Sequence, residues 1–174
     1  MFRRAARGGG DAAPPNVYAM REKMLSIGDD FWIEKGGQRA YRVDGKALRI
    51  RDTLVFEDPQ GREVATIKGK IVAIRETMTI ERQDQVVATV KKALISPLRD
   101  RFVVELASGG ELKVQGNIVA HNYKFERDGR PVAEVSKKWL AIRDTYGVEI
   151  QPGEDDALIL AATVALDQMV HDIG

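Results

Sequence analysis

Ala157-Leu-Ile-Leu-Ala-Ala-Thr-Val-Ala-Leu166 is the stretch of sequence that decides the fold. It is apolar around the whole circumference of a helix rather than along one stripe, and such a helix has to be enclosed on every side. Asp155 or Asp156 is placed to cap the first turn and to complement the helix dipole. Ten residues are too few to cross a bilayer core, which requires about 20. The sequence therefore predicts a buried helix over about residues 155–171.

The region before this helix, residues 17–150, predicts what encloses it. Turn signals such as Asp44-Gly45 and Asp128-Gly129 recur at short intervals, between runs rich in Val, Ile, Thr and aromatic residues. Asp-Gly between such runs is a strong hairpin signal, because both central residues of a type I′ turn need positive φ. Roughly a dozen strands of about four to eight residues fit here without a long helical periodicity between them. The pattern predicts a meander of antiparallel strands.

The strand region also contains an internal duplication. Residues 61–81 (GREVATIKGKIVAIRETMTIE) align without a gap on residues 129–149 (GRPVAEVSKKWLAIRDTYGVE), with 10 of 21 positions identical. Chance gives roughly one identity over that length. Two halves of about six strands can close into a barrel wider than one filled by side chains alone, and a helix about 10 Å across fits such a lumen. We therefore predict a mainly β fold: a closed barrel of about twelve antiparallel strands, in two repeated halves, enclosing a C-terminal hydrophobic α-helix.

Composition excludes most familiar catalytic sites. The chain has 174 residues, 44% of them hydrophobic, which suits one domain with a sizeable core. It has no Cys and two His, so disulfides, thiolate nucleophiles, Cys-based metal sites and multi-His metal centres are absent or poorly supplied. Lys plus Arg is 27 and Asp plus Glu is 26, so the net charge of +1 gives no general attraction to nucleic acid. We predict a protein that is not an enzyme, uses no cofactor or metal and binds no nucleic acid.

The ends of the chain predict its organisation and location. Residues 1–16 are rich in Gly, Ala and Pro, and Phe2 is their one large apolar side chain besides Met1. Such a segment buries too little apolar surface to offset the entropy of ordering, so we expect a disordered leader over 1–16 and a single barrel domain over 17–174. An apolar run after the basic residues, as in a secretory signal, is missing. These features predict a cytoplasmic protein.

Several segments of the chain resemble those of a known family: Met20–Phe31 (MREKMLSIGDDF), Tyr41–Lys46 (YRVDGK), Val114–Asn117 (VQGN), Val132–Trp139 (VAEVSKKW) and Tyr146–Ile150 (YGVEI). The apolar helix residues over Asp156–Met169 follow them. Together they resemble the LURP-one-related family, within the tubby C-terminal-like and phospholipid-scramblase-like fold group. The resemblance implies a twelve-strand barrel around a buried C-terminal helix and little about activity. Tubby-type relatives bind phosphoinositides. Scramblase-type relatives are Cys-rich, calcium-responsive and membrane-anchored, and this chain lacks Cys, a spanning helix and an Asp-x-Asp-x-Asp-Gly loop.

Six lysines are the candidate ligand-binding residues. Two Lys-Lys pairs, Lys91 with Lys92 and Lys137 with Lys138, close strands that the duplication makes similar. Two further lysines, Lys68 and Lys70, lie in the first repeat unit. Lysines gathered in this way form a basic patch that meets phosphate head groups. The alternative, which the sequence alone favours, is that lysines at strand ends and barrel rims discourage strand pairing between molecules and keep the protein soluble.

Two classes of function follow from these observations. The first is a non-enzymatic binding module that recognises anionic phospholipid or phosphoinositide head groups and sits peripherally at the membrane. The second is a soluble scaffold, or a barrel that binds a small ligand or a protein, with no membrane role. Two pairs of equivalent carboxylates, Glu57 with Glu126 and Glu81 with Glu149, resemble an acid–base arrangement, but duplication explains their equivalence without any chemistry.

Overall fold

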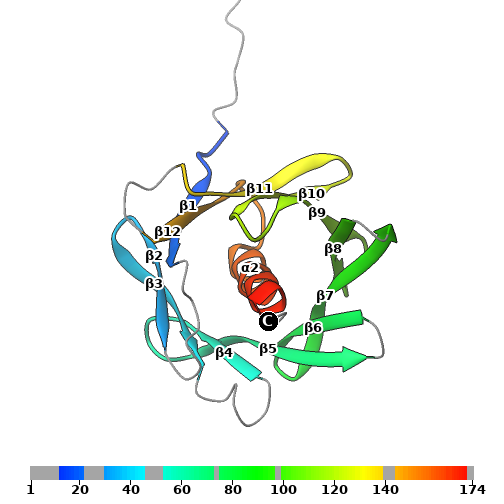
Figure 1. Cartoon of the computed structure of the whole chain (residues 1–174). Coiled ribbons are helices and arrows are strands. Elements are labelled where there is room, and N and C mark those ends of the chain that lie inside the picture. The colour runs from blue at the N-terminus through cyan, green and yellow to red at the C-terminus, as the bar shows by residue number, and fades with distance from the viewer. Residues whose placement is uncertain are drawn as a thin grey trace, which may run out of the picture.

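The protein is a closed barrel with a helix through its centre, as the computed structural model shows (Figure 1). The structure describes residues 12–21, 30–45, 53–72, 75–96, 99–138 and 144–171. Its strands are β1 (Asn16–Arg21), β2 (Phe31–Lys35), β3 (Gln38–Asp44), β4 (Thr53–Glu57), β5 (Glu63–Val72), β6 (Arg75–Arg82), β7 (Gln85–Ser96), β8 (Arg99–Leu106), β9 (Glu111–Asn117), β10 (Asn122–Arg127), β11 (Arg130–Ser136) and β12 (Thr145–Ile150), and its helix is α2 (Asp156–His171).

Each strand pairs with its neighbours along the chain, and β1 pairs with β12 to close the barrel. All pairs are antiparallel, so odd-numbered strands run in one direction along the barrel axis and even-numbered strands in the other. The helix follows β12 and returns through the lumen, as the view down the axis shows (Figure 1). The predicted fold class is confirmed. Of the predicted leader over 1–16, the structure describes residues 12–16, and Asn16 is already the first residue of β1.

The two repeated halves are visible in the strand registers. β4 and β5 are interrupted by a bulge at Phe56/Glu57, and the equivalent pair β10 and β11 is interrupted at Phe125/Glu126. The residue opposite the aromatic side chain is an alanine in both cases, Ala65 in the first half and Ala133 in the second. A bulge bends the strand and increases its twist. The two halves therefore share the bulges that curve the sheet, in addition to their similar sequences.

One of the two predicted Asp-Gly turns is confirmed and the other is not. Asp128-Gly129 connects β10 to β11 with φ angles of 50° and 76°. Asp44 instead belongs to β3, and β4 begins only at Thr53, so no two-residue turn forms there. The second half shows the reason. Phe31 is opposite Val43 as Phe102 is opposite Val114, so Gly45 corresponds to Gly116, two residues further on. Gly116 lies inside β9 at a φ of 126°, and a Cβ there would be 2.5 Å from a backbone oxygen of β10. In that half the glycine permits a close strand contact and does not make a turn.

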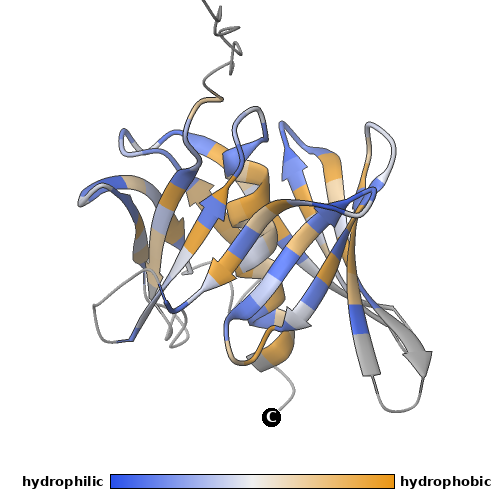
Figure 2. Ribbon diagram, turned by 90° about the horizontal axis from the view of Figure 1, so that it is seen from above, coloured by the Kyte–Doolittle hydropathy of each residue, from blue (hydrophilic) through white to orange (hydrophobic). Residues whose placement is uncertain are grey.

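The core surrounds α2, whose residues from Ile159 to Leu166 are all buried. The backbone of the helix lies nearest to β5, β6, β7 and β12. Aromatic rings from other strands add bulk around the helix, with centroid distances of 5.0 Å for Tyr41 and Phe56 and 5.7 Å for Tyr123 and Phe125. Along the strands, hydrophobic and hydrophilic residues alternate (Figure 2), as expected when one face packs inward and the other meets water. The predicted enclosure of the helix is confirmed.

In the described part of the chain, no helix has the length and apolarity needed to span a membrane.

Candidate binding surface

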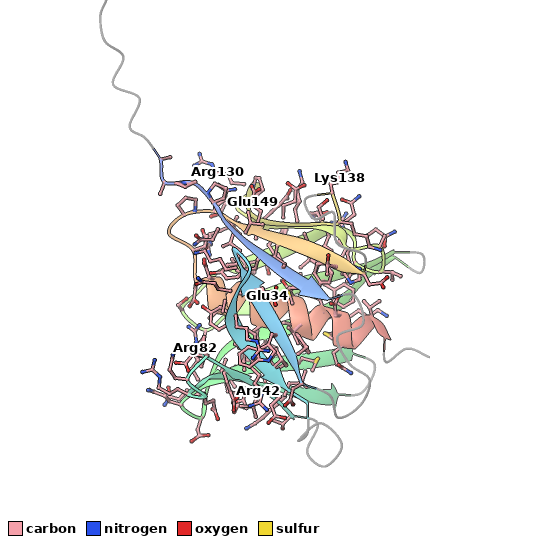
Figure 3. The ribbon with its side chains drawn as sticks, turned by 90° about the vertical axis from the view of Figure 1, so that its left-hand side faces the viewer. Glu34, Arg42, Arg82, Arg130, Lys138 and Glu149 are labelled. Atoms are coloured by element: carbon pink, nitrogen blue, oxygen red, sulfur yellow. The ribbon has the colours of Figure 1, made fainter. Side chains whose placement is uncertain are left out.

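The antiparallel order gives the barrel two chemically different ends. We call the end that contains the connection from β12 to α2 the entry end, and the end toward which α2 runs the exit end. The turns β2–β3, β4–β5, β6–β7, β8–β9 and β10–β11 lie at the entry end, because even-numbered strands finish there. Figure 3 shows the two ends from the side, with Arg82 and Arg130 at the entry end and Lys138 at the exit end.

The candidate lysines all lie toward the exit end. Lys68 and Lys70 occupy the C-terminal half of β5, and Lys137 and Lys138 directly follow β11, as predicted. Lys91 and Lys92 lie inside the C-terminal half of β7, so the predicted strand end at Lys92 is wrong, because the strand continues to Ser96. Lys70 and Lys91 are opposite the same β6 residue, Thr77, in the strand register. β11 is four strands further round the barrel than β7. The structure therefore places the lysines in two groups on one end, one on β5 and β7 and one after β11.

Lys68 and Lys91 bind carboxylates on the barrel wall. Lys68 Nζ donates to Glu81 Oε2 at 2.7 Å, and this bond raises the pKa of the Lys68 ammonium. Lys91 Nζ lies 2.8 Å from Glu105 Oε2. Lys138 is exposed, beside the equally exposed Lys137. The group after β11 is thus the more open of the two, whereas Lys68 and Lys91 also tie neighbouring strands together.

Other charges follow the same division between the ends. Arg75, Arg99 and Arg101 hold exit-end positions on β6 and β8. With the six lysines they outnumber the described acids of this end, which are Asp30, Asp44, Glu76, Asp100 and Asp144. The six connections at the entry end carry mainly acids: Asp58, Asp84, Asp128, Glu154 and Asp155 against Arg62. The division is hidden in the sequence because charges of both signs alternate along the chain. It appears only when strand direction assigns each turn to an end.

At the entry end, arginines hold the start of α2 in place. Both Nη atoms of Arg82 donate to Asp155, at 2.6 and 2.8 Å, and this bonding lowers the pKa of the Asp155 carboxyl. Asp155 Oδ1 also accepts the backbone N–H of Leu158 at 3.1 Å, which confirms that Asp155 is the helix cap. Arg127 Nη1 donates to Glu154 Oε1 at 2.6 Å. The sequence analysis did not single out either arginine, since both partners are distant in sequence.

Inside the barrel, the sequence analysis missed a buried polar cluster on the second half of α2. Asp167 accepts a hydrogen bond from the hydroxyl of Tyr146 at 2.6 Å, and His121 Nε2 lies 3.3 Å from its other oxygen. The His121 ring stacks on the Tyr146 ring at 4.1 Å. His121 and Asp167 are both 4% exposed, so they contact the barrel interior rather than dissolved molecules. No group of three or more His, Cys, Asp or Glu residues able to hold a metal is found among the described residues.

The comparison with known proteins agrees with this architecture. Residues 16–167 match the LURP-one-related family. The chain belongs to this family. The chain is 27% identical over 155 residues to "Uncharacterized protein YxjI" from Bacillus subtilis (strain 168), and the match covers 88% of this chain and 93% of that protein.

A solved structure shows the same fold. The X-ray structure of protein AT5G01750 from Arabidopsis thaliana superimposes with a TM-score of 0.67 over 91% of this chain and 94% of that chain, at 22% identity. At this identity the likeness concerns the fold alone. The LURP-one-related barrel with its enclosed helix is therefore common to both chains, and function has to be argued from the surface of this one.

Proposed function

We propose that this LURP-one-related chain is a non-enzymatic binding module that docks its exit end on anionic phospholipid head groups, phosphoinositides included. The observation that carries the proposal is the placement of all six candidate lysines toward the end opposite the acidic connections. A molecule with this charge division orients its basic end toward an anionic surface even when its net charge is close to zero. The net charge of +1 therefore does not oppose membrane docking.

The strength of such docking follows from the number of bases at the surface. Each Lys or Arg near an anionic membrane contributes about 1 kcal/mol, and the attraction fades within a Debye length of about 8–10 Å. Lys137 and Lys138 are exposed, and Lys92 is half-buried on β7, so several bases can approach the head groups together. The resulting binding is peripheral, reversible and weakened by salt. We expect retention on strongly anionic vesicles and little on neutral ones.

The filled lumen supports a binding role rather than an enzymatic one. α2 occupies the centre of the barrel with side chains that are almost fully buried, so the space that barrels of this width use for ligands is taken by the chain itself. The His121–Asp167 pair is enclosed with it. Recognition then falls to the outer surface and the two ends of the barrel.

Co-sedimentation with vesicles tests the proposal. We expect retention on phosphatidylserine-containing vesicles at low salt, stronger retention when a phosphoinositide is added, and loss of both when Lys91, Lys92, Lys137 and Lys138 are changed to Glu. Lys137 and Lys138 are exposed, so their replacement should move the unfolding midpoint little. Lys91→Glu replaces the pair with Glu105 by a like-charge contact, so the unfolding midpoint of the variant is measured to confirm that it remains folded. The matched control changes Arg39, Arg62, Lys113 and Arg130 to Glu, four exposed bases toward the entry end. It has the same net charge as the first variant.

The outcomes separate the two functional classes. Loss of retention in the exit-end variant alone supports docking by the exit end. Equal loss in both variants would show that net charge, and not the charge division, governs binding. No retention of the wild-type protein at low salt would leave the second class, a soluble scaffold or a barrel that binds a small ligand or a protein.

A further inference from the structure

A hollow at the entry end lies between the first turn of α2 and the wall of the barrel. Its volume is about 430 Å³, within the range of small-molecule sites, about 300–1,000 Å³. It is partly open to solvent, and it lies at the opposite end from the candidate lysines. The lining combines apolar side chains with two arginine–carboxylate pairs: Val87, Leu106, Leu112, Leu158 and Ile159, with Arg82, Arg127, Glu154 and Asp155.

The two ion pairs in this lining differ in the hydrogen-bonding groups that remain for a ligand. Arg82 binds Asp155 through both Nη atoms and both carboxylate oxygens, and Asp155 also caps the helix. That pair therefore holds the start of α2 in place and does not serve as the ligand-binding pair. Arg127 and Glu154 share a single hydrogen bond, between Nη1 and Oε1, at 2.6 Å. The guanidinium carries five N–H donors and the carboxylate a second oxygen, so the Arg127–Glu154 pair presents donors and an acceptor side by side.

From this arrangement we propose that the hollow binds a small zwitterion with an apolar body, of the class of α-amino acids with large apolar side chains. The ligand carboxylate binds the remaining donors of Arg127, its ammonium binds the second oxygen of Glu154, and its side chain covers Leu106, Leu112 and Leu158. The four charged groups of the lining sum to zero, two arginines against two carboxylates. A zwitterion preserves that balance, whereas an anion or a cation alone would place a like charge beside one member of the pair.

The exposure of the pair fits a ligand that arrives from solvent. The Arg127 side chain is 41% exposed and the Glu154 side chain 16%, so the guanidinium is accessible while the carboxylate lies deeper. Leu106, Val87 and Leu158 are half-buried rather than buried, and a bound side chain would remove their remaining surface from water. Apolar burial then adds affinity to the charge recognition. The inference does not rest on the lipid proposal, which concerns the other end of the barrel.

Titration of the full-length protein with four probes tests the assignment, by calorimetry or by NMR shifts of the entry-end residues. L-phenylalanine is expected to bind saturably. N-acetyl-L-phenylalanine lacks the ammonium, phenethylamine lacks the carboxylate and glycine lacks the side chain, and each should bind at least tenfold more weakly. Equal binding of N-acetyl-L-phenylalanine and L-phenylalanine would overturn the zwitterion assignment. Absence of saturable binding of L-phenylalanine would overturn the proposal.

Variants locate the site. Arg127→Gln and Glu154→Gln should each weaken L-phenylalanine binding at least tenfold. Arg62→Gln is the matched control, since Arg62 also pairs with an acid at the entry end, Asp58 at 2.7 Å, but lies outside the hollow. Ala107→Trp places a bulky ring in the hollow from an exposed turn, keeps all four ion-pairing residues, and should abolish binding even if Arg127 proves necessary for folding. Unchanged affinity in Ala107→Trp would exclude the hollow as the site.

Discussion

The helix α2 forms the same hydrogen bond near each of its ends, in two different environments. At the entry end the hydroxyl of Tyr18 donates to Asp156 at 2.6 Å, and toward the exit end the hydroxyl of Tyr146 donates to Asp167 at 2.6 Å. Asp156 is half-buried and also accepts a bond from Asn16 at 2.7 Å, whereas Asp167 is buried against His121. Equal geometry therefore does not imply equal energy. Removing one partner of the hydrogen bond costs little stability where water can replace it, and much where the remaining group is buried.

The entry end is also where charge pairs lie at the surface. Its acids are paired with exposed or half-buried arginines, and the hollow lies among them. In the middle and second half of α2, residues 159–167 are buried without interruption. A helix that is buried along most of its length, with solvent-accessible charge pairs beside its first turn, suits a module that binds through its outer surface. The predictions below test this division, beginning with the largest expected effect.

Removal of α2 should abolish folding. A fragment ending at Glu154 loses every buried side chain of the helix, among them Leu160, Val164 and Leu166, which are 0% exposed. Each large apolar side chain removed from a core costs about 2–5 kcal/mol, against a typical total stability of about 5–15 kcal/mol. Circular dichroism and size-exclusion chromatography should show an unfolded or insoluble chain. A soluble fragment that melts cooperatively would contradict the enclosed-helix architecture.

A single charge in the helix core should be the next largest effect. Leu160→Ala is expected to cost about 2–5 kcal/mol through lost burial and a cavity, and Leu160→Asp more, because the carboxylate has neither water nor a partner. Leu158→Ala is the matched variant at the entry end, where the side chain is half-buried beside the hollow. Its cost should be about 1 kcal/mol. Urea denaturation measures all three, and equal costs for Leu158→Ala and Leu160→Ala would argue against the difference between the two regions.

The two Tyr–Asp bonds allow a direct comparison. Asp167→Leu leaves the Tyr146 hydroxyl without its buried acceptor and removes the carboxylate beside His121, and we expect a cost of about 3–5 kcal/mol. Asp167→Asn keeps an acceptor for Tyr146 and should cost less. Asp156→Leu removes the partner of Tyr18 where water can replace it, for about 1 kcal/mol. The free energies of unfolding in urea provide the test, and similar losses for Asp156→Leu and Asp167→Leu would show that burial does not separate the two ends.

The sequence predicts two parts of this fold: the uniformly apolar helix and the duplicated strands. The apolar stretch Ala157–Leu166 leaves no polar face, so its burial is dictated locally. The duplication carries turn, bulge and strand together, so one half supports the assignment of the other. Asp44-Gly45 misled because an Asp-Gly pair is typical of a turn, although the aligned glycine of the second half serves a close contact between strands.

The candidate sites were less predictable because they depend on distant residues. His121 and Asp167 are 46 positions apart, and nothing near His121 in the sequence indicates an acid partner. Arg82 meets Asp155 across 73 positions. The Lys-Lys pairs in β7 and after β11 were recognisable from the sequence, but their common end of the barrel follows from strand direction. The local sequence pattern predicts helices and strands. The closed topology is needed to determine which charged residues lie at the same end of the barrel.

The smallest expected effect concerns the pH dependence of the entry-end pair. Arg82 lowers the pKa of Asp155, so the pair contributes stability above the unfolded-state pKa of an aspartate, about 3.9. That contribution is lost as pH falls through the lower pKa of the folded state, since protonated Asp155 no longer attracts the guanidinium. The Asp155 side chain is 45% exposed, and such partly solvated pairs contribute less than about 1 kcal/mol. Arg82→Gln should therefore lower the urea midpoint slightly at pH 7 and converge with the wild-type protein at acidic pH, once Asp155 is protonated in the folded state. A deficit that stays constant across this range would mean that Arg82 stabilises the entry end by packing, and that the charge pair at the hollow has no part in it.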